Sequence, residues 1–71
     1  MDRTEDVPVG AQDIRLGQLL KLVGAADSGG AVKQLLCEGQ VRVNGRVEKR
    51  RGAHLSPGDV ITSGDQRWRM G

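Results

Sequence analysis

Residues 28–51 read SGGAVKQLLCEGQVRVNGRVEKRR and contain the signals of a short helix followed by a β-hairpin. Ser28 can accept hydrogen bonds from the free N–H groups of the first helical turn, so it is a candidate N-cap. Val32 and Leu36 lie one turn apart on an apolar face, and Gly39 suits a left-handed cap at the end of the helix. We therefore expect a helix of about two and a half turns between Ser28 and Gly39.

The hairpin follows this helix directly. Residues 41–43 alternate valine, arginine and valine, which predicts a strand with one apolar face. The Asn-Gly pair at residues 44–45 is the strongest short signal for a two-residue hairpin turn, in which both residues have positive φ. The return strand is expected over residues 46–48. The triple cation at residues 49–51 should then lie at the end of the hairpin nearest the helix.

Another helical pattern lies earlier in the chain. We expect this helix between Asp13, its candidate N-cap, and Gly24, which suits the end of a helix. Its apolar residues recur at helical spacing: Leu16, Leu19, Leu20 and Val23. The short link to Ser28 should bring the two helices against each other.

Two more strands are expected after the hairpin. Residues 56–59, which read Ser-Pro-Gly-Asp, have the pattern of a type II turn and should lead into a strand at residues 60–62. A tight turn at residues 64–65 should lead into a last strand at residues 66–70. The order of helices and strands predicts an α+β fold, with two short helices packed on a small antiparallel sheet.

The composition limits what else the chain can contain. It has 71 residues, 37% of them hydrophobic, which is enough for one small domain. One cysteine, Cys37, and one histidine, His54, are too few for a structural zinc site or an internal disulfide, so we expect no cofactor. No apolar run is long enough to cross a membrane or to act as a secretory signal. We therefore expect a cytoplasmic protein with no membrane association.

The charges are unevenly distributed along the chain. Residues 1–13 contain one cation and four anions, whereas residues 14–71 contain ten cations and five anions and so carry a net charge of +5. Such a basic segment is typical of proteins that bind polyanions. We interpret residues 1–13 as a flexible acidic leader and residues 14–71 as a single domain that binds a polyanion. The alternation of Val7 and Val9 also leaves open a short edge strand.

Candidate phosphate-binding groups gather around the second helix and the hairpin. The N–H groups from Gly29 to Val32 can bind an anion, because Gly29 and Gly30 leave the backbone open, and Lys33 can reach the same phosphate. An alternative is that the two glycines only let the helices pack closely. Cations on the first helix could be merely solubilising, and the triple cation could be an ordinary solvated loop. The other candidates are the helix cap and the exposed cations: Arg15, Lys21, Ser28, Arg42, Arg46, Lys49, Arg50 and Arg51.

The aromatic content indicates which kind of nucleic acid is bound. Modules that read single strands stack bases on aromatic side chains, but Trp68 is the one aromatic residue here and is expected in the core. Neither expected helix offers a set of base-reading residues for a DNA major groove. Recognition of phosphates and shape remains, and it suits a structured RNA.

Several of these motifs together resemble the RNA-binding domain named for ribosomal protein S4, over about residues 14–62. They most resemble the small stand-alone bacterial members, which are described as ribosome-associated. The resemblance implies a fold of the alpha-L type whose two helices and hairpin start form the RNA face. The chain departs from it at Gly29, where many relatives carry arginine, and at His54, where close relatives carry a cation. The residues that carry the resemblance are 15–21, 27–30, Lys33, Leu36, 38–39, Val41, 43–45, 50–52 and 57–59.

Three classes of function are compatible with the sequence. We favour a non-catalytic monomer that binds structured RNA, ribosomal or transfer RNA, on the ribosome during its assembly or in rescue. An accessory subunit of an RNA-modifying enzyme is an alternative, although Ser28, Cys37 and His54 form no nucleophile–base set and the length leaves no second domain for catalysis. A protein-interaction module that uses the acidic leader is the third class.

Overall fold

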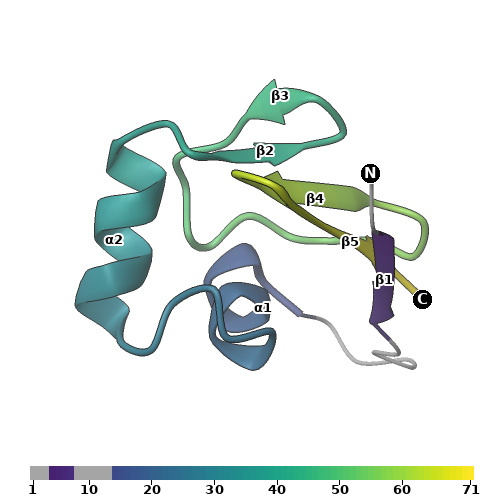
Figure 1. The fold of residues 1–71 in the computed structure, drawn as a ribbon, viewed down its shortest axis with the longest axis horizontal. Helices are drawn as coiled ribbons and strands as arrows, with labels where there is room; N and C mark the ends of the chain where they lie inside the picture. Colours follow the sequence, from purple (N-terminus) through teal and green to yellow (C-terminus); the bar gives the residue numbers. More distant parts are fainter. Residues whose placement is uncertain (1–3, 8–13) are drawn as a thin grey trace.

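The computed structural model describes residues 4–7 and 14–71, which form two helices and one five-stranded sheet (Figure 1). The elements in chain order are β1 (Thr4–Val7), α1 (Leu16–Leu22), α2 (Gly29–Cys37), β2 (Val41–Val43), β3 (Arg46–Val47), β4 (Val60–Ser63) and β5 (Gln66–Met70). The strand order in the sheet is β1-β5-β4-β2-β3, and every pair except β1 with β5 is antiparallel. The predicted α+β fold is confirmed.

Strand β1 lies within the segment that we expected to be a flexible leader. It pairs in parallel with β5, with Val7 opposite Met70, and the side chain of Val7 is buried. Asp6 also binds the guanidinium of Arg69, with Oδ1 at 2.8 Å from Nη2. The expectation of a flexible leader therefore does not hold for Thr4–Val7. The rest of residues 1–13, including Val9, lies outside the described residues.

Helix α1 begins later than Asp13 predicted. Its N-cap position is Arg15, whose N–H donates to Oε1 of Gln18 at 2.9 Å, and Asp13 itself lies outside the described residues. Residues 14–16 instead run beside the loop before β4. The N–H of Leu16 donates to the carbonyl of Ala53 at 2.9 Å, so the loop satisfies a donor that a helix start leaves open.

Helix α2 and the hairpin follow the sequence closely. Oγ of Ser28 accepts a hydrogen bond from the N–H of Ala31 at 3.1 Å, and Gly39 has a φ of +71° after the helix. In the turn between β2 and β3, Asn44 and Gly45 have φ values of +53° and +84°, as a type I′ turn requires. The N-cap, the left-handed end and the hairpin turn are confirmed.

The later turns also match their predictions. Gly58 has a φ of +92°, and the N–H of Asp59 donates to the carbonyl of Ser56 at 3.0 Å, which is the geometry of a type II turn. The side chain of Asn44 donates to Oδ1 of Asp59 at 3.0 Å and so ties this turn to the hairpin. Gly64, with a φ of +59°, turns the chain from β4 into β5.

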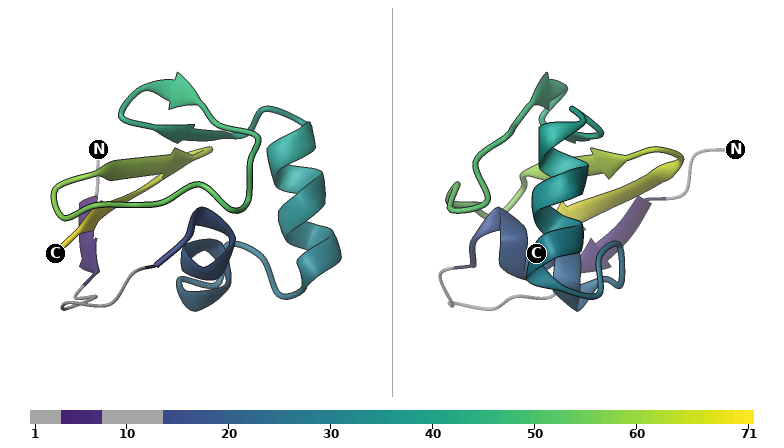
Figure 2. Two further views of the ribbon diagram at one scale, coloured as in Figure 1. Left: turned by 180° about the vertical axis from the view of Figure 1, so that it is seen from behind. Right: turned by 90° about the vertical axis from the view of Figure 1, so that its left-hand side faces the viewer.

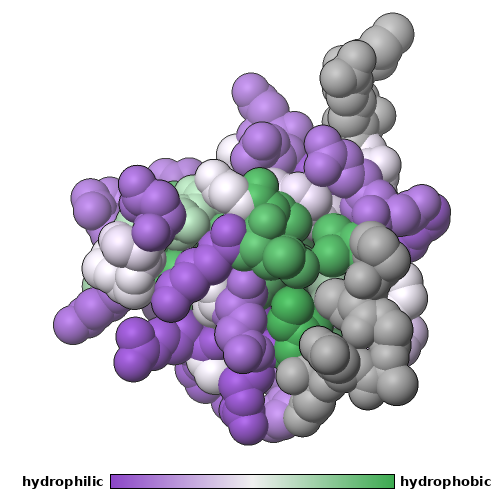
Figure 3. Space-filling model, turned by 90° about the horizontal axis from the view of Figure 1, so that it is seen from below, coloured by the Kyte–Doolittle hydropathy of each residue, from purple (hydrophilic) through white to green (hydrophobic). Residues whose placement is uncertain are grey.

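One hydrophobic core joins the helices to the sheet. Both helices contribute buried side chains that pack with one face of the strands, and the two further views show how the helices lie against the sheet (Figure 2). Seen from the side of α1, an apolar area remains at the surface (Figure 3). Leu22 is the most exposed large apolar side chain of the described part. The buried core consists of Val7, Leu16, Leu19, Leu20, Ala26, Val32, Leu36, Val41, Leu55, Ile61, Trp68 and Met70.

Candidate nucleic-acid interface

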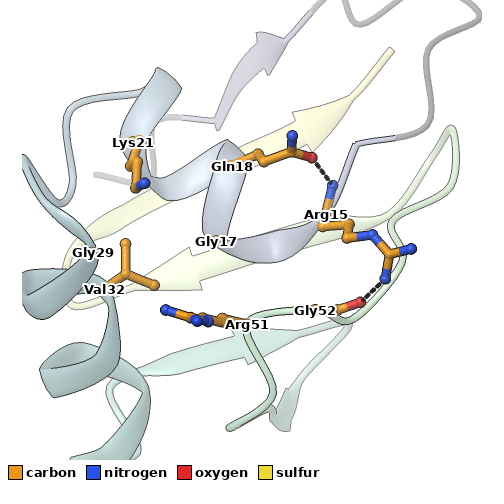
Figure 4. Close-up of a pocket in the computed structure, with 8 residues that line it drawn as sticks. All are labelled: Arg15, Gly17, Gln18, Lys21, Gly29, Val32, Arg51 and Gly52. Atoms are coloured by element: carbon orange, nitrogen blue, oxygen red, sulfur yellow. Dashed lines mark hydrogen bonds between the residues drawn. The ribbon is translucent and has the colours of Figure 1, made fainter.

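A cavity of about 410 Å³ lies between α1, the start of α2 and the loop after β3 (Figure 4). We call it the helix hollow. Lys21 and Arg51 extend toward the space between the two helices, whereas Arg15 turns toward the loop and donates from Nη1 to the carbonyl of Gly52 at 2.8 Å. The lining residues are Arg15, Gly17, Gln18, Lys21, Gly29, Val32, Arg51 and Gly52.

Gly17 explains how Arg51 reaches this position. The N–H of Gly17 donates to the carbonyl of Arg51 at 2.9 Å, which fixes the loop against the first turn of α1. A Cβ at Gly17 would lie 3.3 Å from both Cβ and the carbonyl oxygen of Arg51. A side chain there would push the loop away, so the glycine allows the close approach of loop and helix.

A smaller cavity of about 200 Å³ adjoins the first on the α2 side of the loop. We call it the hairpin hollow; it is lined by Lys33, Leu36, Cys37, Lys49 and Arg51. This placement confirms that the triple cation begins near the end of the hairpin closest to the helix. Arg51 lines both hollows, and we call the two together the basic groove. Five of its side chains are cationic, and no carboxylate of the described residues lines it.

Arg50 lies apart from its two cationic neighbours. Its Nε and Nη2 donate to the two carboxylate oxygens of Glu48, each at 3.2 Å. It lines a third cavity with His54, which meets the helix hollow at Gly52 and contains neither Lys49 nor Arg51. The hydrogen bonds from the Arg50 side chain and N–H hold the pKa of the Glu48 carboxyl below its ordinary value. The sequence grouped residues 49–51 as one cluster, but the structure brings only Lys49 and Arg51 to the groove.

Arg42 and Arg46 are also placed away from the groove. Neighbouring residues of a strand point to opposite faces, and Val41 is buried, so Arg42 lies on the outer face of the sheet. There it is in register with Thr62, which in turn pairs with Arg67. Arg46 is exposed in β3, next to the hairpin turn and at the opposite end of the hairpin from Lys49.

The start of α2 is open, as expected, but offers fewer N–H groups than we predicted. Ala31 donates its N–H to Oγ of Ser28, and Val32 donates to the carbonyl of Ser28. Of the first turn, the N–H groups of Gly29 and Gly30 are therefore the ones left to bind an anion. A Cβ at Gly29 would meet nothing within 4 Å, and at Gly30 its nearest neighbour would be Oγ of Ser28 at 3.9 Å. Close helix packing therefore does not explain these glycines.

Two kinds of residue were missed from the sequence. Gly17, Gln18 and Gly52 line the helix hollow without a chemical signal of their own, although a glycine within an apolar helical pattern can indicate a close approach. Glu48 was assigned only to the return strand. Its signal was its position as an anion directly before three consecutive cations.

No three histidine, cysteine or acidic side chains among the described residues are grouped so that they could hold a metal ion. Cys37 is free and exposed. Within the same residues, neither helix is long and apolar enough to span a membrane.

The protein is thus a small α+β domain with a basic groove between its two helices and the loop after β3. The family model described as S4 domain matches residues 7–70, and the chain belongs to that family. Of the similar proteins, "Probable ribosome maturation protein RlbA" of Bacillus subtilis is 42% identical over 55 residues, which are 78% of each chain. "Putative RNA-binding protein YbcJ" of Escherichia coli is 39% identical over 49 residues, 69% of this chain and 70% of its own. The resemblance found in the sequence is confirmed.

Proposed function

We propose that this chain is a non-catalytic RNA-binding protein that uses the basic groove to bind structured RNA. The observation that carries the proposal is the convergence of cations from α1, α2 and the loop after β3 on two hollows that share Arg51. Each cation that meets a phosphate releases condensed counterions, which drives binding without reading the base sequence. Membership of the S4 domain family supports the same assignment.

The shape of the groove favours a folded RNA over a single strand. Trp68 is 2% exposed, so no aromatic side chain of the described residues is available to stack on a base. The remaining contacts are phosphate contacts from fixed positions, which a folded RNA with closely spaced backbones can satisfy together. Lys33 and the open N–H groups of Gly29 and Gly30 can hold one such phosphate at the start of α2.

We infer that the partner is ribosomal RNA, bound by a monomer in the cytoplasm during ribosome assembly. The name of the Bacillus subtilis relative refers to ribosome maturation, and this supports assembly over rescue. Transfer RNA is the second target to compare, because its folded backbone offers the same phosphate chemistry. Mapping of crosslinked RNA from cells distinguishes these targets.

Two double variants with the same change in charge test the groove. Lys49→Ala/Arg51→Ala removes two cations that line it, and Arg42→Ala/Arg46→Ala removes two from outside it. Affinity for a structured ribosomal RNA fragment, measured over a range of salt concentrations, should fall in the first variant. The slope of log affinity against log salt should become shallower by about 1.4–1.8, since each lost phosphate contact contributes 0.7–0.9.

The control variant separates placement from total charge. Arg42→Ala/Arg46→Ala should retain the slope of the parent chain, with only a small loss of affinity from the weaker long-range field. Equal losses in the two variants would show that net charge, and not the groove, determines binding. Retention of a protein partner without any retention of RNA would instead support the interaction-module alternative.

A further inference from the structure

We propose that Glu48 is a positioning residue for RNA binding, which directs Lys49 and Arg51 into the basic groove and holds Arg50 outside it. This inference rests on the proposed function, because it names what keeps the same groove in order. Glu48 itself lines neither hollow of the groove, so its role is exerted through the neighbours that it binds.

The carboxylate of Glu48 fixes the backbone where the chain leaves the hairpin. Its Oε2 accepts hydrogen bonds from the N–H of Lys49 at 3.1 Å and from the N–H of Arg50 at 3.3 Å. The N–H of Glu48 itself donates to the carbonyl of Val41 at 3.1 Å, which anchors the residue to β2. The direction of the chain at residues 49 and 50 is therefore set from the sheet.

The same carboxylate holds the middle cation of the three. Nε and Nη2 of Arg50 donate to Oε2 and Oε1 of Glu48, so the guanidinium is bound at two points. The Glu48 side chain is 22% exposed and that of Arg50 is 81% exposed. Because the Arg50 side chain is largely in solvent, the pair adds little to stability, and its main consequence is the orientation of Arg50.

The loop is fixed at its other end by α1. Gly17 donates its N–H to the carbonyl of Arg51, and the turn is closed by a hydrogen bond of 3.1 Å from the N–H of Ala53 to the carbonyl of Arg50. Between these anchors, Lys49 and Arg51 line the hairpin hollow while Arg50 lines the cavity beside His54. Like charges on adjacent residues repel, and pairing one of them lets the other two stay ordered before RNA arrives.

Replacement of Glu48 should change RNA affinity in the direction opposite to that expected from net charge alone. Removal of an anion from a basic surface should tighten RNA binding if only charge matters. We expect Glu48→Ala to weaken binding about fivefold, the cost of ordering one or two long side chains during association. Glu48→Gln keeps an oxygen for the two N–H groups but cannot pair with Arg50, so its loss should be smaller.

Glu38→Gln is the matched control, because Glu38 is an exposed anion at the end of α2 that lines neither hollow. It makes the same change of charge as Glu48→Gln and should leave affinity equal or slightly higher. Tighter binding by Glu48→Ala, like that of the control, would overturn the inference. Melting temperatures of all variants, measured alongside, report any loss of fold.

A combined variant separates positioning from a general structural role. If Glu48 acts through Lys49 and Arg51, Glu48→Ala should cost little further affinity once both cations are already alanine. The same fivefold loss in that background would contradict the inference while leaving the groove intact. An affinity unaffected by Lys49→Ala/Arg51→Ala alone would refute the groove itself, and with it both proposals.

Discussion

Glu48 and Arg50 form an ion pair at the surface, and the pair changes the pKa of the Glu48 carboxyl. Hydrogen bonds from the Arg50 side chain are the largest cause that lowers the pKa of Glu48 below its ordinary value of 4.5, followed by the bond from the Arg50 N–H. A carboxyl with a depressed pKa in the folded state stabilises the fold above its unfolded pKa. This contribution is lost as the pH falls through the folded-state value. The pair is therefore intact at neutral pH.

The pKa of Glu48 should rise toward 4.5 when Arg50 is replaced by alanine. The reason is that the side-chain hydrogen bonds and the positive charge that favour the carboxylate are removed together. An NMR titration of the Glu48 side-chain carboxyl measures this directly. Arg46→Ala removes another hairpin arginine, which makes no hydrogen bond to Glu48 in the described structure, and should leave the titration unchanged. The same midpoint in Arg50→Ala and in the parent chain would rule out the pair.

Some single residues could be assigned from the sequence and others could not. The positive φ values of Asn44 and Gly45 follow from a local requirement of the turn, so a dipeptide was enough to predict them. The directions of Arg50 and Arg51 follow from contacts with Glu48 and with Gly17. Gly17 lies more than thirty residues away from Arg51 in the chain, and nothing near the triple cation indicates that contact.

The ends of the two helices are likewise determined by neighbouring residues in one case and by distant residues in the other. Helix α2 (Gly29–Cys37) starts and ends at signals within its own sequence, and the structure confirms both. Helix α1 (Leu16–Leu22) takes its start from the loop that follows β3, because carbonyls of Arg51 and Ala53 accept its first N–H groups. The residues near Asp13 give no sign of these carbonyls, because the chain brings them back to α1 only after the hairpin.

Truncation of Leu36 should test the packing of α2 on the rest of the fold. Leu36 is 2% exposed and belongs to the core shared with α1 and the sheet, so Leu36→Ala leaves a cavity. We expect a loss of about 2–5 kcal/mol in the free energy of unfolding, a large share of what so small a domain has. Gln34→Ala changes an exposed residue of the same helix and should stay within about 0.5 kcal/mol. Denaturant melts of both variants make the comparison, and a parent-like midpoint for Leu36→Ala would contradict the assigned core.

The whole molecule separates its cations onto different surfaces. The groove gathers its cations on the side of the helices, while Arg42 and Arg67 lie along the outer face of the sheet. The sequence predicted a basic domain and all five cations of the groove. It could not tell which cations share a surface, because residues 42–51 pass from the sheet to the loop within ten positions.

Strand β1 connects the beginning and the end of the described chain. It extends the sheet at the edge farthest from β3, and Figure 1 shows it on the opposite side of the molecule from α2. Beyond the strand pairing, the N–H of Gly71 donates to the carbonyl of Val7 at 2.8 Å. The alternation of Val7 and Val9 left a short edge strand open, and of these two residues Val7 lies in β1. The parallel pairing of β1 depends on residues that are sixty positions away.

Removal of residues 1–7 should lower stability without changing RNA affinity. The fold would lose the buried Val7 side chain, worth about 1.5–3 kcal/mol when fully buried, together with the hydrogen bonds to β5. The groove should keep its geometry, since none of its lining residues belongs to β1. Thermal melts and RNA titrations well below the melting temperature measure the two effects separately.

Asp6→Asn, which breaks only the exposed contact with Arg69, serves as the control and should change stability by less than about 1 kcal/mol. A weaker affinity of the shortened chain at such temperatures would mean that the N-terminal segment takes part in RNA binding, while an unchanged melting temperature would mean that β1 is not part of the stable fold.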